Sequence, residues 1–237
     1  MDKNKFIEEI NKINININSH IEKQLKIYYE FLLEYNEHTN LTRIISEEDV
    51  YLKHYYDSLT ILKIVDIKKI KSILDIGTGA GFPGVVLKIF NPHLELTLLD
   101  SNKKKTIFLE ELIKKLELDN VSVINDRSEK YIENKREQFD LVTSRAVADL
   151  KILSELSLPY VKLNGYFIPL KADSKEELDK SNYAINILGG EIIESQNFLL
   201  PIENSKRMLI KIKKIKKTPI KYPRTYDKIL KKPLKIY

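Results

Sequence analysis

The chain has 237 residues, of which 43% are hydrophobic and 31% are charged, and its formal net charge is +6. This composition is that of a globular protein, and no run reaches the roughly 18 apolar residues that a membrane span requires. The N-terminus, MDKNKFIEEI, lacks the apolar core of a secretory signal, so we expect a cytoplasmic location. Because cysteine is absent, disulfides, cysteine-ligated metals and a cysteine nucleophile are excluded, and we expect no metal site.

Basic residues are concentrated at the C-terminus. From Lys206 to Tyr237 there are 13 Lys and Arg residues against one acid, Asp227, whereas the rest of the chain carries more acids than bases. Such a block attracts phosphate backbones through counterion release. It predicts a nucleic-acid partner; a solvated tail without a partner is the alternative.

Residues 1–71 have a mainly helical pattern after an opening stretch that has none. Asn and Ile alternate from Ile13 to Asn18, which imitates a strand. A helix is predicted from Ser19, where Ser19 and Glu22 form a capping box and apolar residues then recur every three or four positions. A second helix is predicted from Ser46, where three acids suit the positive end of its dipole. We expect these helices to form an N-terminal cap.

A glycine-rich turn follows the first clear strand. The strand, residues 72–76, is an apolar run interrupted by Asp75, and four of the chain's seven glycines then follow at positions 77, 79, 81 and 84. A helix is predicted over residues 83–90. Glycine admits positive φ and lets a ligand approach the backbone, so the unit predicts a nucleotide-like ligand.

Three interpretations of this turn compete. The first is a tight turn without a ligand. The second is a dinucleotide site, since Gly79, Gly81 and Gly84 satisfy G-x-G-x-x-G. The third is a site for S-adenosylmethionine (SAM). The pattern D-x-G-x-G-x-G, starting at Asp75, favours SAM. A carboxylate at a strand's end can hold the ammonium group of a methionine moiety, directly or through water, whereas it would repel a pyrophosphate.

Strands and helices alternate beyond the turn. Strands are predicted over residues 94–100, 121–126, 139–146 and 165–171, and helices over residues 102–118, 129–132 and 149–160, with another opened by Ser174 and Glu177. Residues 191–200 and 207–213 are predicted to form an antiparallel pair of strands. The order predicts an α/β fold with a doubly wound, seven-stranded, mostly parallel sheet. We divide the chain into the N-terminal helical cap (1–71), a SAM-binding core (72–213) and a basic C-terminal tail (214–237).

Polar residues follow the second and third strands. Asp100 lies 23 residues beyond Gly77, where a carboxylate can accept hydrogen bonds from the ribose hydroxyls of an adenosine; otherwise it is the N-cap of the next helix. Residues 126–129 follow the third strand at the same sheet edge and are placed to bind adenine through backbone groups. Phe82 offers an apolar wall nearby, or belongs to the ordinary core.

These motifs together resemble the RsmG family, also called GidB. The resemblance spans roughly residues 30–234 and is carried by DIGTGAGFPG, LLD, NDRSE, FDLVTSRAVA, KYPR and KKPL, with NLTRI and HYYDSL nearer the N-terminus. That family comprises class I SAM-dependent methyltransferases acting on N7 of a guanine in the 530 loop of bacterial 16S rRNA. The resemblance therefore implies SAM as cofactor and 16S rRNA, or a small-subunit precursor, as partner.

Site residues are carried over by position. The resemblance implies cofactor contacts at Gly77, Phe82, Ser128, Glu129 and Arg145, to which the turn and the ribose argument add Gly79 and Asp100. The candidates for contact with RNA are His54, Lys171, Arg207, Lys221 and Arg224. Arg145 is also the candidate at the meeting point of methyl donor and acceptor; alternatively it forms a structural ion pair, for example with Asp75.

Missing motifs narrow the acceptor. Enzymes that methylate an exocyclic base amine commonly carry Asn/Asp-Pro-Pro-aromatic after the fourth strand, where this chain has Ser144-Arg145-Ala146, and methylation of pyrimidine carbon 5 needs a cysteine. Guanine N7 presents an in-plane lone pair and loses no proton, so catalysis is expected to be alignment without a base. The alternatives are a methyltransferase for a small molecule or protein, a nicotinamide-dependent oxidoreductase, and a non-catalytic RNA-binding protein. We expect a monomer.

Overall fold

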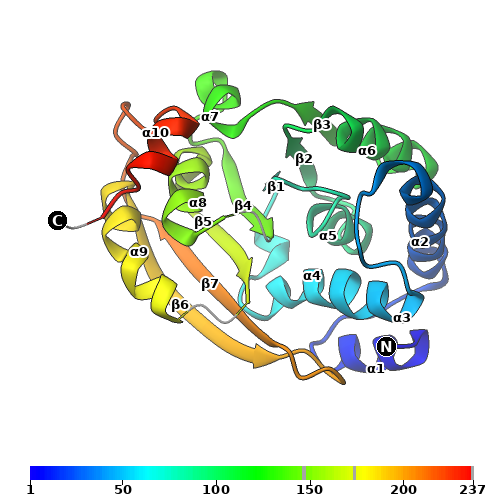
Figure 1. Ribbon diagram of the computed structural model, residues 1–237. Coiled ribbons are helices and arrows are strands. Elements are labelled where there is room, and N and C mark those ends of the chain that lie inside the picture. Colours follow the sequence, from blue (N-terminus) through cyan, green and yellow to red (C-terminus); the bar gives the residue numbers. More distant parts are fainter. Residues whose placement is uncertain (146–147, 173–174, 236–237) are drawn as a thin grey trace.

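The computed structural model describes residues 1–145, 148–172 and 175–235, and within these ranges seven strands form one sheet (Figure 1). The strands are β1 (Ser72–Ile76), β2 (Glu95–Asp100), β3 (Val121–Asn125), β4 (Phe139–Arg145), β5 (Val161–Lys171), β6 (Gly190–Leu199) and β7 (Lys206–Lys214). The α-helices are α1 (Lys3–Asn11), α2 (Ser19–Thr39), α3 (Glu47–Asp49), α4 (Asp57–Leu59), α5 (Gly84–Phe90), α6 (Lys103–Lys115), α7 (Ser128–Tyr131), α8 (Leu150–Ser157), α9 (Lys175–Ile187) and α10 (Tyr226–Lys231).

The strand order is β3-β2-β1-β4-β5-β7-β6. Strands β1 to β5 pair in parallel, and β7 runs antiparallel to both β5 and β6. The predicted doubly wound, mostly parallel sheet and its antiparallel pair are therefore confirmed. Strand order reverses between β1 and β4, and in such sheets the ligand crevice lies outside the carboxyl ends of the strands at that point.

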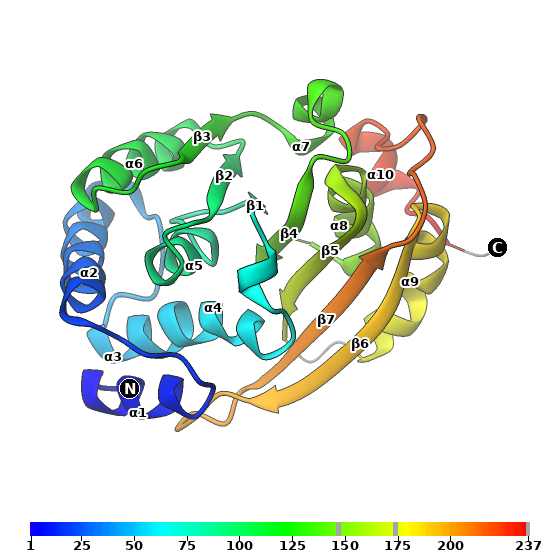
Figure 2. The ribbon, with the colours of Figure 1, turned by 180° about the vertical axis from the view of Figure 1, so that it is seen from behind.

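The sheet is buried on both faces because apolar residues fill both sides of its strands. Ile73, Leu98 and Leu141 belong to one hydrophobic cluster, while their chain neighbours Leu74, Leu99 and Val142 belong to a second. Successive side chains of a strand point to opposite faces, which produces this division. Helices α2, α5 and α6 cover one face, and α8 and α9 lie on the other (Figures 1 and 2).

The N-terminal residues contain a helix that was not predicted from the sequence. Helix α1 begins after Asp2, whose side chain accepts a hydrogen bond from the backbone N of Lys5, and residues 15–18 form neither helix nor strand. Helix α2 begins at Ser19 as predicted, but the capping box is wrong. Asn18 is the N-cap, because its backbone is extended and its side chain accepts from the backbone N of Ile21.

The second predicted helix is a continuous but irregular segment over residues 47–63. It begins where predicted, and Ser46 is its N-cap, because the Ser46 hydroxyl accepts from the backbone N of Asp49. After α3 the chain winds as a π-helix over Val50–Tyr56, continues as α4 and ends in a 3₁₀ turn over Thr60–Lys63. π-Helical turns are rare and often occur at functional sites. This one contains His54.

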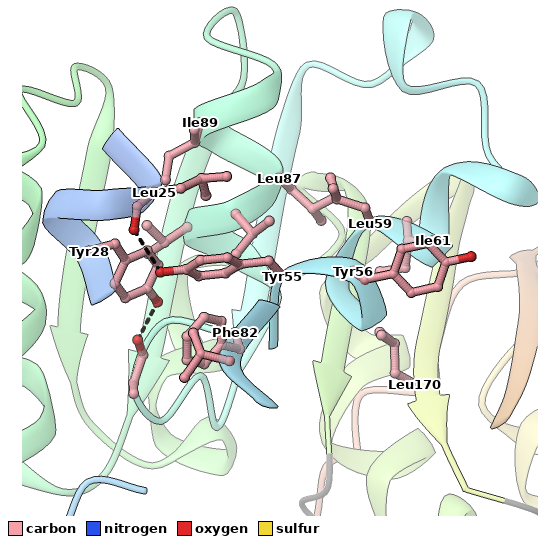
Figure 3. Packing of buried hydrophobic residues seen from close by; sticks show 14 of the residues in the cluster. Leu25, Tyr28, Tyr55, Tyr56, Leu59, Ile61, Phe82, Leu87, Ile89 and Leu170 are labelled. Atoms are coloured by element: carbon pink, nitrogen blue, oxygen red, sulfur yellow. Dashed lines mark hydrogen bonds between the residues drawn. The ribbon is translucent and has the colours of Figure 1, made fainter. Parts of the chain in front are cut away.

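Aromatic residues join the N-terminal helices to the glycine turn (Figure 3). The hydroxyl of Tyr28 donates to the carbonyl of Ala80 at 2.5 Å, and the hydroxyl of Tyr55 donates to the carbonyl of Leu25 at 2.9 Å. The rings of Tyr28 and Phe82 stack with centroids 5.0 Å apart. Residues of the N-terminal cap and of the sheet thus share one hydrophobic cluster, and the cap holds the turn in place.

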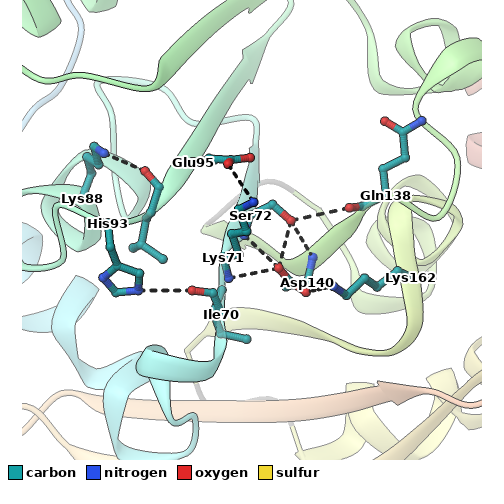
Figure 4. A network of polar contacts seen from close by, with 10 residues as sticks. Ile70, Lys71, Ser72, Lys88, His93, Glu95, Gln138, Asp140 and Lys162 are labelled. Atoms are coloured by element: carbon teal, nitrogen blue, oxygen red, sulfur yellow. Dashed lines mark hydrogen bonds and ion pairs between the residues drawn. The ribbon is translucent and has the colours of Figure 1, made fainter.

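A polar network ties together the amino ends of β1 and β4 (Figure 4). Asp140 Oδ2 accepts hydrogen bonds from the backbone N atoms of Lys71 and Ser72 and from Ser72 Oγ, and Asp140 also pairs with Lys162. The network lies at the opposite ends of the strands from the expected crevice, beside a separate cavity of about 450 Å³ that Asp140 and Lys162 also line.

Some predicted boundaries differ from the structure. Strand β5 begins at Val161 rather than at residue 165. It follows directly on the 3₁₀ turn Leu158–Tyr160, without an intervening loop. Ala146, the predicted end of the fourth strand, and Ser174, the predicted cap, lie outside the described residues. None of the helices in the described ranges has the length and apolar character needed to cross a membrane.

Candidate functional site

Three adjoining cavities line the carboxyl edge of the sheet. The central cavity, of about 430 Å³, is formed by the glycine turn, the end of β2 and the 41–42 loop. The loop cavity, of about 270 Å³, shares Gly77, Asp100 and Ser101 with it and extends to residues 126–129. The strand-end cavity, of about 510 Å³, lies on the other side and shares His54 and Arg145 with the central one. Together they form a row.

The glycines of the turn have different roles. A Cβ built on Gly79, where φ is +62°, has no described atom closer than the carbonyl O of Gly77 at 4.0 Å, so this position opens into the central cavity. A Cβ on Gly81 would lie 2.6 Å from the hydroxyl of Tyr28, and one on Gly84 would lie 2.8 Å from Asp75 Oδ2. Gly79 leaves the backbone bare beside the central cavity, whereas Gly81 and Gly84 permit close packing.

Asp75 is a structural part of the turn. Its Oδ2 accepts from the hydroxyl of Thr78 at 2.8 Å and from the backbone N of Gly84 at 2.9 Å. The side chain is fully buried and lines none of the three cavities, so it is not placed for the direct ammonium contact that the sequence suggested. Within the described part of the chain, Oδ1 has no hydrogen-bond partner. Burial raises the pKa of Asp75 to about 6.

Asp100 stands between the central and loop cavities. Its Oδ2 accepts from the backbone N of Gly79 at 3.0 Å, and its Oδ1 accepts from the backbone N of Asn102 at 2.9 Å. The N-cap of α6 is Asn102, which accepts from the backbone N of Lys104, so the alternative interpretation of Asp100 as the cap is wrong. A carboxylate at this junction is suited to the two hydroxyls of a ribose.

The 126–129 loop reaches this row of cavities, as its position after the third strand predicts. Ser128 Oγ donates to the carbonyl of Leu156 at 2.8 Å, and the hydroxyl of Tyr160 donates to the carbonyl of Ser128 at 2.5 Å. Glu129 lies 4.0 Å from Arg127 in an ion pair. With Ile76, Leu99 and Leu156 these residues give the loop cavity apolar walls and a polar rim.

Phe82, His54 and Arg145 form a stack beside the glycine turn. The centroids of the Phe82 and His54 rings are 4.1 Å apart, and the guanidinium carbon of Arg145 lies 5.1 Å from the centroid of Phe82. Arg145 Nη1 donates to the carbonyl of Lys53 at 2.5 Å. Phe82 is only 4% exposed yet lines the central cavity, so it belongs to the core and to the site at once.

The protonation state of His54 follows from its contacts. Arg145 Nη2 donates to His54 Nδ1 at 2.8 Å, so the ring proton is on Nε2 and donates to Thr42 Oγ1 at 3.2 Å. Burial, and then the charge of Arg145, lower the pKa of His54 to about 3. His54 is therefore neutral at pH 7, and neither ring nitrogen is available as a base. It forms part of the partition between the central and strand-end cavities.

Charged residues surround the strand-end cavity in pairs. Asp57 lies 3.6 Å from Arg145 Nη1 and 3.3 Å from Arg207 Nε, and burial raises the pKa of Asp57. Lys171 lies 2.8 Å from Glu177. The ion pair considered for Arg145 is thus present, but its partner is Asp57 rather than Asp75, because Asp75 lies beneath the turn.

The structure separates the predicted RNA-contact residues into two groups. His54, Lys171 and Arg207 line the strand-end cavity together, whereas Lys221 and Arg224 line none of the three cavities. Arg224 binds Glu155 through both carboxylate oxygens, at 2.8 and 2.6 Å. Lys214 is fully buried and donates to the carbonyl of Leu158. The basic tail is therefore only partly a solvated block of charge.

The sequence did not single out several residues that line the cavities: Thr42, Asp57, Thr78, Ser101, Lys105, Leu156 and Tyr226. Thr42 and Asp57 stand in the NLTRI and HYYDSL segments, so those segments were the signal available for them. Tyr226 had no such signal, because it lies between the KYPR and KKPL segments and belongs to neither.

The residues present fit SAM. The bare backbone at Gly79 leaves room against the turn, Asp100 offers acceptors for a ribose, and the loop cavity has apolar walls of the kind that suit a base. The same fold occurs in solved structures. A predicted O-methyltransferase from Agrobacterium tumefaciens superposes with a TM-score of 0.56 at 16% identity over 68% of this chain and 82% of that one. For TYW2 of M. jannaschii, solved in complex with AdoMet, the TM-score is 0.50 at 16% identity over 62% and 70%.

The fold and the site define a class I SAM-dependent methyltransferase. A family model described as rRNA small subunit methyltransferase G, GidB, matches residues 21–208, and the chain belongs to that family. The relative named ribosomal RNA small subunit methyltransferase G from Lactobacillus helveticus is 45% identical over 99% of this chain and 100% of its own. The protein of that name from Bacillus subtilis is 49% identical over 85% and 86%. The resemblance seen in the sequence is thereby confirmed.

Proposed function

We propose that this protein transfers a methyl group from SAM to N7 of a guanine in the 530 loop of 16S rRNA. Family membership makes an rRNA the substrate class. The observation that carries the choice of atom is the partition between the cavities. The strand-end cavity adjoins the cofactor side through His54 and Arg145, neither of which can remove a proton from a substrate. The two carboxylates that line this cavity are held in ion pairs, Asp57 with Arg145 and Arg207, and Glu177 with Lys171.

Guanine N7 suits such a site. SAM, when bound, supplies a methyl group on a positively charged sulfur, and N7 attacks through a lone pair in the plane of the base. No proton leaves before attack, so the reaction needs no general base. This agrees with a neutral His54 whose Nδ1 accepts from Arg145 and whose Nε2 donates to Thr42. The protein's contribution is alignment, which is worth up to about 7–11 kcal/mol when the geometry is ideal.

Residue roles follow from the row of cavities. We assign SAM to the central and loop cavities, with contacts from Gly77, Gly79, Phe82, Asp100, Ser128, Glu129 and Arg145. The base enters the strand-end cavity, where Lys171 and Arg207 are the candidates for RNA phosphate. Lys221, exposed and outside the row, is a candidate for more distant phosphate, whereas Arg224 is held by Glu155. We place the enzyme, as a monomer, in the bacterial cytoplasm, where ribosomal RNA is found.

Labelled SAM and 16S rRNA test the proposal directly. The purified protein is incubated with methyl-labelled SAM and either naked 16S rRNA or 30S particles, and the labelled guanine is located by cleavage at N7-methylguanine. A matched RNA with 7-deazaguanine at the target provides the control, because its ring carries C–H in place of N7. We expect label on one guanine of the 530 loop and none on the 7-deaza RNA. Labelling of the 7-deaza position, or of no guanine in either substrate, contradicts the proposal.

The rival functions predict different results. A methyltransferase for small molecules or proteins would leave both RNA substrates unlabelled, and a nicotinamide-dependent enzyme would bind NAD more tightly than SAM in calorimetry. A non-catalytic RNA-binding protein would retain its cellular role when Asp100 is replaced by alanine. For the enzyme proposed here, affinity for RNA falls steeply as salt rises, because phosphate contacts release counterions.

A further inference from the structure

The loop cavity has a wall that comes from the C-terminal tail. Its other lining residues belong to the ends of β1 and β2, to residues 126–129 and to α8, whereas Tyr226 is the first residue of α10. Tyr226 is half-buried, and the guanidinium carbon of Arg127 lies 5.3 Å from the centroid of its ring. A residue about 100 positions beyond the 126–129 loop thus lines the same cavity as that loop.

Specific contacts hold this segment in place. The backbone N of Arg224 donates to Glu155 Oε1 at 2.9 Å, and the Arg224 guanidinium binds both oxygens of the same carboxylate, which is fully buried on α8. Arg136 Nη2 donates to the carbonyl of Tyr222 at 2.5 Å. Ile229 of α10 is also fully buried. The position of Tyr226 is therefore fixed by the fold on both sides of it.

The lining of the cavity indicates what this wall contacts. Ile76, Leu99 and Leu156 are apolar, Tyr226 adds an aromatic ring, and the polar side chains come from the 126–129 loop, Asp100 and Ser101. Flat heteroaromatic rings bind well in such a slot, since base–aromatic stacking is favourable for every base. Asp100, which is shared with the central cavity, stands where the ribose would join the two.

We propose that Tyr226 stacks on the adenine ring of SAM, so that the C-terminal tail is part of the cofactor site. The inference rests on the SAM component of the proposed function and not on the RNA component. It also gives part of the tail a role other than RNA binding, because Arg224 and Tyr222 serve to position the wall.

Calorimetry with SAM and S-adenosylhomocysteine tests the stacking. Tyr226→Ala is expected to weaken both ligands about tenfold or more, as for loss of a base–aromatic stack. Tyr226→Phe retains the ring and should bind within twofold of the wild type. Tyr183→Ala is the matched control, because Tyr183 is an exposed tyrosine of α9, 38% accessible, that lines none of the three cavities. Its affinity should be unchanged.

The outcomes are distinguishable. A Tyr226→Ala protein that melts like the wild type and binds SAM within twofold of it overturns the inference, and so does a Tyr226→Phe protein that loses as much affinity as the alanine variant. If Tyr226→Ala lowers the melting temperature, Tyr226→Leu takes its place, because leucine keeps apolar bulk but has no aromatic ring. A Tyr226→Leu protein that binds SAM within twofold of the wild type then overturns the inference. A wild-type protein that binds no SAM overturns the cofactor assignment itself, and the inference with it.

Discussion

Replacement of Gly79 by alanine is expected to abolish most cofactor binding without unfolding the protein. The new methyl group has no described neighbour to contact, since the nearest atom is the carbonyl O of Gly77 at 4.0 Å, and it enters the central cavity. The backbone cost is modest. An L-residue at φ of +62° costs about 1–2 kcal/mol of stability.

The loss of affinity can be estimated from overpacking. An extra methyl group in a filled site costs about 1–3 kcal/mol, and each 1.4 kcal/mol is a factor of ten in affinity. Gly79→Ala should therefore weaken SAM binding by roughly 5- to 150-fold. Gly79→Val, with two further methyl groups, should leave no measurable affinity.

Gly81→Ala is the matched control, because the same change two residues later meets protein rather than ligand space. Its Cβ would lie 2.6 Å from the Tyr28 hydroxyl and 2.7 Å from Val85 Cγ2, and both residues are fully buried. We expect this variant to lose stability by more than Gly79→Ala does, since strain and overpacking add. Its affinity for SAM falls only as its folded fraction falls.

Calorimetry with SAM and urea denaturation of the same preparations check the contrast. Gly79→Ala should show a small decrease in unfolding free energy and a large decrease in affinity, and Gly81→Ala the reverse order. If Gly79→Ala binds SAM as the wild type does, then the position does not face the ligand and the assignment of the central cavity is wrong.

Two further predictions concern buried charge. Burial gives Asp75 a folded-state pKa of about 6 against its ordinary 3.8, so the folded protein holds this proton more tightly than the unfolded chain does. The free energy of unfolding should therefore fall, by up to about 3 kcal/mol, as pH rises from about 4 to about 6. Urea midpoints of Asp75→Asn should lack that fall, and an identical pH dependence in both proteins would disprove the assignment. Arg145→Lys removes the planar guanidinium that donates to both Lys53 O and His54 Nδ1. The single-turnover rate of methyl transfer should drop more than tenfold, while the melting temperature changes little. A wild-type rate would exclude a role of Arg145 in aligning the substrates.

The fold could be predicted from the sequence because its signals are local. Apolar runs such as residues 72–76 mark strands buried on both faces, and the alternation of strands with capped helices predicts a doubly wound sheet. The clustering of four glycines marks the turn. Residues 1–18 show the limit of this approach, since the short run of Phe6, Ile7 and Ile10 at helical spacing is followed at once by the Asn–Ile alternation that imitates a strand.

The residues alone predicted candidate site positions where these follow on strands, and the family resemblance supplied others, such as His54. Gly77, Asp100 and the 126–129 loop come to one sheet edge because parallel strands bring their carboxyl ends together. The surroundings of the individual glycines could not be predicted in the same way. The sequence singled out Gly79 as a cofactor contact, but that a Cβ on Gly81 would instead meet the hydroxyl of Tyr28 depends on a residue more than fifty positions earlier in the chain.

By itself, the sequence determined the order of strands and helices, the glycine turn, the acid that follows β2 and membership of a methyltransferase family. Only the tertiary structure decided that Arg145 pairs with Asp57 rather than Asp75, that His54 Nδ1 accepts from Arg145, which lies 91 residues further along the chain, and that Tyr226 lines the loop cavity. The physical reason is range: periodicity and capping record the geometry of neighbours along the chain. Ion pairing, protonation and the walls of a cavity depend on which distant segments packing brings together.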